Sequence, residues 1–201
     1  MAGDTFYTIS GPADGEYKEK KSKFLAFARP VADAAGAKAI IAAFQKEYFD
    51  ARHVCWAYML GPDRNTFLSS DNGEPSGTAG KPILGQINSL GLTDVVVVVV
   101  RYFGGIKLGT SGLIAAYRAA AREALEAATV IECHVAETIT ITFPYIAMNE
   151  VMRAIKNSTA EIKAQTFDNS CSITLHIRAD DAPALRSRLL DIDGTTEQQP
   201  G

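Results

Sequence analysis

The sequence of 201 residues predicts an α+β protein of two domains. Three observations lead to this fold class. Strand-like and helix-like segments alternate along the first two thirds of the chain. Residues 94–103 form a continuous, largely β-branched run that is typical of a central strand covered on both faces. From Glu137 onwards a new pattern of strands and helices begins, in an order typical of a ferredoxin-like unit.

The first part of the chain predicts a sheet with helices packed against it. Residues 23–31 predict a strand and residues 34–49 a helix, because apolar residues recur at helical spacing in the second segment. Residues 53–60 and 66–69 predict a hairpin around a turn rich in glycine, proline and asparagine. There follow a glycine-rich loop over 71–82, a helix over 82–90, the strand over 94–103, a second glycine-rich segment over 104–112 and a helix over 113–128.

The last part of the chain predicts a small ferredoxin-like α+β domain. Its expected elements are a strand over 138–143, a helix over 145–157, a hairpin of 160–167 and 170–178 around Asp168 and Asn169, a helix over 180–190 and a final strand near Thr195. The boundary falls near residues 132–137. We therefore divide the chain into domains at 1–132 and 133–201.

Composition and charge exclude several classes of protein. Apolar residues make up 47% and charged residues 21%, which excludes intrinsic disorder and a fibrous repeat. The formal net charge is −3; residues 1–132 are neutral and residues 133–201 carry the negative excess. Neither domain therefore has the basic excess of a general nucleic-acid-binding surface, and any anion site must be local.

The cysteines and the hydropathy pattern predict a cytoplasmic protein. Cys55, Cys133 and Cys171 are far apart and form neither a CxxC pair nor a disulfide framework. The longest aliphatic run, Val95 to Val100, is far shorter than the roughly 20 residues of a membrane span. We expect no membrane anchor and no signal peptide.

The two glycine-rich segments predict a local anion-binding cleft. Glycines let backbone N–H groups approach a ligand, and the start of the helix after residue 112 offers free donors and a partial positive charge. The spacing matches neither the P-loop nor the dinucleotide fingerprint. The candidate ligand-binding residues are Gly77, Thr78, Lys81, Arg101, Gly104, Gly105, Lys107, Gly109, Thr110 and Arg118.

Structural explanations compete with a binding role at these positions. The glycines can serve tight packing of a helix against the sheet. The hydroxyl groups of Thr110 or Ser111 can cap the helix that follows them.

Asp71 and Glu74 are the carboxylates of the first loop and the candidate catalytic residues. Two acids beside a glycine cradle can hold a metal or act as acid and base. The alternative is that they accept hydrogen bonds from the backbone of a turn. His53, His134 and His176 are isolated in the sequence, and Cys55 fits a small core residue better than a reactive thiol. We expect no cofactor and no metal site.

Three motifs resemble the IMPACT family in its bacterial two-domain, YigZ-like form. They are His53 to Tyr58 (HVCWAY), Ser70 to Pro82 (SDNGEPSGTAGKP) and Val98 to Thr110 (VVVRYFGGIKLGT), and the resemblance of the N-terminal domain covers about residues 1–130. It implies a βαβ-type first domain like the fourth domain of elongation factor G and a second domain like its fifth. That pairing implies contact with nucleic acid or the ribosome.

The sequence departs from the family pattern at three positions. Asn72 stands where the family usually has a second Asp, which weakens a paired-carboxylate or two-metal site. Val54 stands where bacterial relatives often have a second His, which removes a His-His metal site. Ser111 replaces the usual Gly, so position 111 need not adopt a positive φ.

Three functional hypotheses follow. The leading one is a translation-linked regulatory or binding protein that contacts RNA, the ribosome or another anionic partner through the glycine-rich basic cleft. The alternative is a small-molecule hydrolase or phosphate-ligand enzyme that uses Asp71 and Glu74. The third is a scaffold whose ferredoxin-like domain offers a sheet face or edge to a protein partner.

Overall fold

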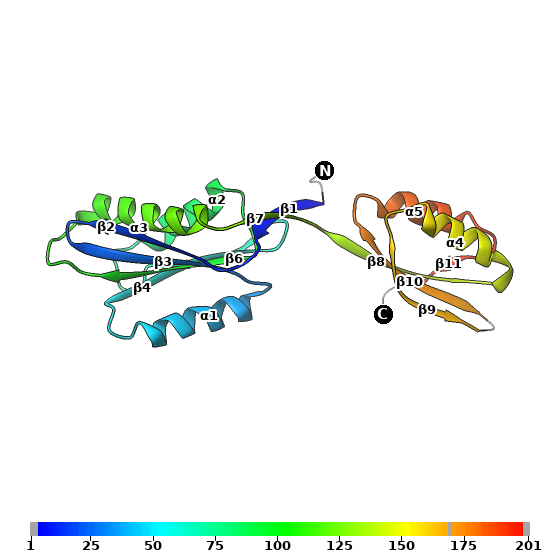
Figure 1. Cartoon of the computed structure of the whole chain (residues 1–201), viewed down its shortest axis with the longest axis horizontal. Coiled ribbons are helices and arrows are strands. Elements are labelled where there is room, and N and C mark those ends of the chain that lie inside the picture. The colour runs from blue at the N-terminus through cyan, green and yellow to red at the C-terminus, as the bar shows by residue number, and fades with distance from the viewer. Residues whose placement is uncertain (1–3, 169, 199–201) are drawn as a thin grey trace. The chain divides into compact units, whose positions relative to one another are not determined.

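The computed structural model describes residues 4–168 and 170–198, and these divide into two compact units. Residues 6–133 form the N-terminal unit; residues 134–198, together with Asp4 and Thr5, form the C-terminal unit. Helices and sheets occur in both units, which confirms the α+β class (Figure 1). That residues 1–132 and 133–201 fold as independent domains stays a prediction.

The N-terminal unit is built on a five-stranded antiparallel sheet with β6 at its centre. In sheet order its strands are β2 (Ala13–Glu19), β3 (Ser22–Pro30), β6 (Val95–Tyr102), β4 (His53–Leu60) and β5 (Thr66–Ser70). β3 and β4 are both antiparallel to β6, so they run parallel to each other on either side of it. The helix that joins them completes a split βαβ connection.

Helices cover both faces of this sheet (Figure 1). The helices are α1 (Ala34–Glu47), α2 (Gly80–Ser89) and α3 (Gly109–Glu126). Val95, Val97 and Val99 pack with α2 and α3, whereas the alternate valines of β6 pack with α1 on the other face. The valine run is continuous because the strand has no solvent face, and the prediction of a doubly covered strand is confirmed.

Three strands that lie wholly or mostly in residues 6–133 are not predicted from the sequence patterns. β1 (Thr5–Ile9) pairs with β7 (Val130–His134), and β2 lies at an edge of the large sheet. β2 contains alternating charged residues, and its inner face is covered by α3 at Gly15, which has no side chain to signal burial. Edge strands of this kind lack the apolar alternation on which strand prediction depends.

The start of α3 also differs from the prediction. The helix begins at Gly109, four residues before the predicted start, because its two glycines hide the helical pattern. Leu108 precedes the first helical residue, and Thr110 and Ser111 lie within the first turn. The expectation that one of these hydroxyls caps the helix is therefore wrong.

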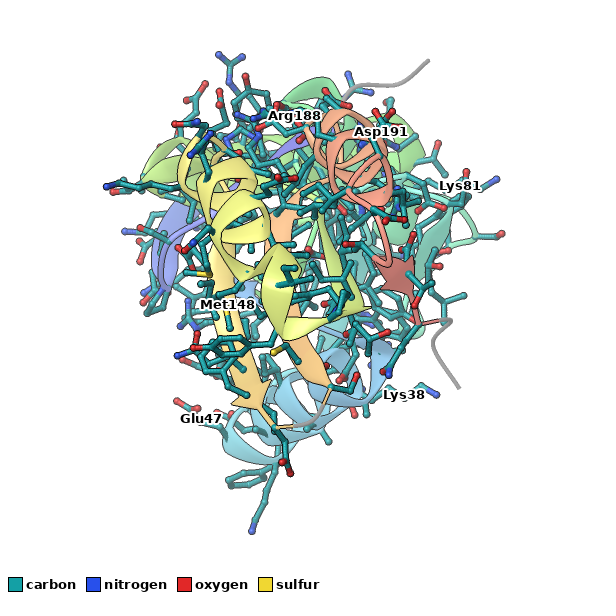
Figure 2. The ribbon with its side chains drawn as sticks, turned by 90° about the vertical axis from the view of Figure 1, so that its right-hand side faces the viewer. Lys38, Glu47, Lys81, Met148, Arg188 and Asp191 are labelled. Carbon is teal, nitrogen blue, oxygen red and sulfur yellow. The ribbon has the colours of Figure 1, made fainter. Side chains whose placement is uncertain are left out.

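The C-terminal unit has the ferredoxin-like order of elements. Its elements are β8 (Ala136–Phe143), the 3-10 turn Tyr145–Ala147, α4 (Met148–Lys156), β9 (Glu161–Phe167), β10 (Cys171–Arg178), α5 (Ala182–Leu190) and β11 (Thr196–Glu197). The antiparallel sheet has the order β11-β8-β10-β9, as that fold requires. The helices α4 and α5, marked by Met148 and Arg188 in Figure 2, pack together over one core. Asn169, predicted at the hairpin turn, lies outside the described residues.

Asp4 ties the start of the described chain to the C-terminal unit. Its carboxylate is 4% exposed and accepts hydrogen bonds from Nε and Nη2 of Arg178, at 3.0 and 2.7 Å. The Arg178 guanidinium holds the pKa of Asp4 well below its ordinary value.

Within the described residues, no helix is long and apolar enough to cross a membrane.

The close approach of α3 to β2 gives the first prediction. A Cβ at Gly15 would lie 2.5 Å from the backbone nitrogen of Ala124, so Gly15→Ala should lower the free energy of unfolding by about 1–3 kcal/mol. Gly85→Ala is the control, because Gly85 lies in α2 with open space around its Cβ position. In urea unfolding, the free energy of unfolding of Gly85→Ala should equal that of the wild type or exceed it by up to about 1 kcal/mol. Equal stabilities of Gly15→Ala and the wild type would contradict the close packing.

Candidate anion-binding site

A cavity of about 450 Å³ opens at the N-terminal end of α3; we call it the α3 pocket. Five of the predicted site residues line it: Glu74, Arg101, Lys107, Gly109 and Thr110. Arg52, His53, Gly73, Pro75, Phe103, Leu108 and Leu113 complete the lining. The pocket thus joins the end of β6, the first glycine-rich loop and the start of α3.

A buried ion pair connects the loop to β6 at this pocket. Nη1 of Arg101 donates to Oε1 of Glu74 at 2.6 Å, and the two residues are 6% and 9% exposed. The hydroxyl of Tyr117, on α3, donates to the same oxygen at 2.8 Å. Burial, together with the nearby Cys55 and Glu74, raises the pKa of Tyr117, so the phenol keeps its proton and remains a donor.

Arg101 has a further donor that the protein leaves unused. Its Nε is buried and has no hydrogen-bond partner among the described residues. A buried donor without an acceptor costs about 1–3 kcal/mol. This Nε has almost no accessible surface, so Arg101 lines the α3 pocket through other atoms of its side chain.

The start of α3 adds backbone donors to the same pocket. The first N–H groups of a helix have no partner within it and carry a partial positive charge. At α3 the residue before the helix is Leu108, which provides no capping side chain. Gly109 has φ of +71°, a left-handed conformation that favours glycine, and with Lys107 and Thr110 it lines the pocket.

The start of α2 is already occupied by an internal anion. The carboxylate of Asp71 accepts hydrogen bonds from the backbone nitrogens of Gly77, Ala79 and Gly80, at 2.7, 2.9 and 2.8 Å. Burial alone would raise the pKa of Asp71, but these three hydrogen bonds outweigh it and hold the pKa below its ordinary value. Asp71 therefore organises the loop and the first turn of α2, as the backbone-acceptor alternative expects.

His53 is brought to the pocket by the same loop, although the sequence suggested an isolated histidine. Its Nδ1 lies 2.8 Å from the carbonyl oxygen of Asn72, which can only accept, so Nδ1 carries the proton of the neutral ring. The other nitrogen, Nε2, is 4.0 Å from Oε2 of Glu74. Asn72 adopts a φ of +40°, in a local turn that brings its carbonyl group to His53. Such a turn leaves no periodic pattern in the sequence.

Three other predicted site residues lie in a neighbouring hollow. Gly77, Lys81 and Arg118 line a cavity of about 420 Å³ between α2 and α3. A further hollow between the same helices shares Arg118 and Gln86 with it and continues to Arg122. We call the two hollows together the α2–α3 groove.

The remaining predicted ligand residues have structural contacts of their own. A Cβ at Gly104 would lie 2.0 Å from the carbonyl carbon of Lys21, and the Gly104 N–H donates to Oγ of Ser22. Thr78 is buried, and its hydroxyl donates to the carbonyl of Pro75 at 2.6 Å. Gly105 has φ of +88°, so a glycine suits the loop at this point. For Gly104 and Thr78, packing and turn formation account for the residue.

The polar groups around the pocket do not form a recognisable metal centre. No group of three or more His, Cys, Asp or Glu side chains suited to a metal occurs among the residues that the structure describes. Cys55 is fully buried; its Sγ donates to the Asp71 carbonyl at 3.0 Å, and burial raises its pKa to about 12. The thiol is thus a protonated core group.

The charges of the α3 pocket favour an anion. Arg52, Arg101 and Lys107 face a single carboxylate, Glu74, so the lining has a net charge of plus two when His53 is neutral. The predicted cations Arg101 and Lys107 are brought together here. Arg52, His53 and Phe103 were not predicted as site residues; the HVCWAY and VVVRYFGG motifs that contain or adjoin them were the available signal.

Known proteins resemble this chain in sequence and in fold. The Impact N-terminal domain family matches residues 20–125. The chain is 45% identical over 112 residues to the IMPACT family member YigZ of Escherichia coli, covering 55% of each chain. It is 34% identical over 181 residues to an IMPACT family member of Haemophilus influenzae, covering 88% of this chain and 86% of the relative. A crystal structure described as that of a hypothetical protein has a TM-score of 0.72 at 28% identity and covers 98% of both chains.

The role of Asp71 gives the second prediction. Asp71→Asn should lower the free energy of unfolding at neutral pH by about 1–3 kcal/mol, because an amide cannot replace a carboxylate that accepts three N–H groups. The pKa of Asp71 is lower in the folded state than in the unfolded state. The wild type should therefore keep its full excess in free energy of unfolding over the variant above about pH 4, and lose it as the pH falls through the folded-state pKa.

Urea unfolding between neutral pH and about pH 3 measures this difference. Glu47→Gln is the control, because Glu47 is an exposed carboxylate at the end of α1. An Asp71→Asn variant as stable as the wild type at neutral pH would contradict the proposed organising role.

Proposed function

The chain belongs to the IMPACT family, and from this premise we propose that it is a translation-linked regulatory protein that contacts RNA phosphates through the α3 pocket and the α2–α3 groove. The observation that carries the proposal is the gathering of Arg52, Arg101 and Lys107 around a pocket at the uncapped start of α3. Phosphate oxygens are strong acceptors for arginine and for helix N-termini. The family resemblance to two domains of elongation factor G supports the link to translation.

The arrangement of cations along α3 supports contact with a strand longer than one nucleotide. Lys107 precedes the helix, and Arg118 and Arg122 follow along it toward its C-terminal end. Arg122 is paired with Glu126, which lines the same hollow, at 2.6 Å, so Lys81, Lys107 and Arg118 carry most of the argument. From Thr110 to Arg122 the helix extends about 18 Å, at about 1.5 Å per residue. A groove with spaced cations is the kind of surface that follows a single-stranded backbone.

The hydrolase alternative has weaker support. Its two carboxylates are Asp71, which accepts three backbone N–H groups, and Glu74, which is bound by Arg101 and Tyr117. A general base or a metal ligand needs a lone pair directed at the reacting group or ion. We therefore favour binding over catalysis.

The proposed compartment is the cytoplasm. Cys55, Cys133 and Cys171 are all free thiols, and free cysteines are typical of a reducing environment.

RNA binding measured across salt concentrations tests the proposal. A short single-stranded RNA should bind saturably, and Lys107→Ala and Lys81→Ala should each weaken it by about threefold to tenfold while reducing the salt slope by about one. Lys38→Ala is the matched control, because Lys38 lies on α1, across the sheet from α2 and its Lys81 (Figure 2). The control variant should bind as the wild type does.

Two results would contradict the RNA proposal. One is the absence of saturable binding, and the other is equal affinity of the wild type, Lys107→Ala and Lys81→Ala. Absence of RNA binding together with specific retention of a purified protein partner would instead favour the scaffold hypothesis.

A further inference from the structure

The walls of the α3 pocket are of two kinds. Donors and cations occupy one part, where Lys107, Gly109 and Thr110 lie at the start of α3 and Arg52 and Arg101 line the wall beside them. The lining also includes four apolar residues, Pro75, Phe103, Leu108 and Leu113. A site for a bare inorganic anion would not need this apolar surface.

Phe103 is the most informative apolar residue of the pocket. It follows β6, is 46% exposed, and its ring centroid lies 5.6 Å from the guanidinium carbon of Arg101. A large aromatic side chain that lines a cavity and stays half exposed is suited to stack against a planar group. Nucleobases stack on such rings without regard to sequence.

The size and charge of the pocket limit what can bind. A volume of about 450 Å³ is in the range of sites that hold one small ligand. The net charge of plus two matches the dianion of a phosphate monoester better than the single charge of an internal phosphodiester. A monoester also has three terminal oxygens for donors that converge from α3, Lys107 and Arg101, where a diester has two.

On these grounds we propose that the α3 pocket binds a nucleotide with a terminal phosphate monoester, with the phosphate at the start of α3 and the base against Phe103. This inference rests on the proposed function and specifies the ligand of the same site. The terminal phosphate has two sources, a free nucleotide or the phosphorylated end of an RNA strand. In the second case the rest of the strand follows the α2–α3 groove.

Binding of the full chain to matched ligands tests the phosphate. A 5′-phosphorylated RNA should bind at least about tenfold more tightly than the same RNA with a 5′-hydroxyl, since the lost contacts are charge-assisted. AMP should compete for the pocket and adenosine should not. If a 3′-phosphorylated RNA binds more tightly than the 5′ form, the 3′ end of the strand is the one that enters the pocket. That result would still support recognition of a terminal phosphate monoester.

Variants separate the base from the phosphate. Phe103→Ala should weaken AMP binding by about 5- to 100-fold, the range of one base–aromatic stack, and leave the affinity for inorganic phosphate unchanged. Phe67→Ala is the matched control, because Phe67 is 55% exposed on the edge strand β5. Lys107→Ala removes a cation at the start of α3, so it should weaken the binding of both AMP and inorganic phosphate. Lys107 is exposed, so its substitution should leave the fold intact.

The outcomes distinguish this inference from the proposed function. Equal binding of the phosphorylated and hydroxyl RNAs, without competition by AMP, would overturn the inference and leave RNA binding intact. Binding of AMP without any RNA binding would support the inference and overturn the RNA proposal. Binding of neither would overturn both, and an unchanged AMP affinity in Phe103→Ala would overturn the role of the base.

Discussion

The buried ion pair between Glu74 and Arg101 is the interaction on which the α3 pocket depends. It joins the first glycine-rich loop to the central strand, and the Tyr117 hydroxyl joins both to α3. An ion pair in the interior loses its hydration, so it is stable only where further hydrogen bonds satisfy its atoms. Tyr117 supplies such a bond on the carboxylate side, and the unused Nε of Arg101 leaves the other side incomplete. The ion pair thus fixes the part of the pocket wall to which both residues belong.

The two helices that begin near this ion pair, α2 and α3, have the same kind of N-terminus, but their N–H groups have different surroundings. Each helix N-terminus presents unpaired N–H groups and a partial positive charge. At α2 the protein provides its own anion, Asp71, and the glycine-rich loop folds around it. At α3 none of the side chains that the structure describes caps the helix, and the first turn lines the pocket. The sequence pattern of glycines is similar in both segments, but one site is filled and the other is open.

Much of the fold was predictable because it rests on local patterns, whereas the site rests on contacts between distant residues. The valine run predicts β6, and the strand and helix order after Glu137 predicts the ferredoxin-like unit. β2 was missed because Gly15 and its charged neighbours give no apolar alternation. Arg101 was predicted as a cation of the cleft, but its pairing with Glu74 depends on the path of the loop. His53 appeared isolated because its partner is a backbone carbonyl, which every residue has.

The local charge of the pocket would let a unit with a formal charge of only +1 over residues 6–133 bind the proposed anion. Long-range attraction scales with net charge and is screened within about 10 Å at ordinary salt concentrations, so a unit with so small a net charge attracts nucleic acid weakly from a distance. Inside the α3 pocket three cations and one carboxylate act at contact range, where partial burial reduces screening. In the proposed mode of binding, the groups that enter the pocket would recognise a particular end or nucleotide, and the α2–α3 groove would add contacts along the strand. A uniformly basic surface would instead bind any polyanion.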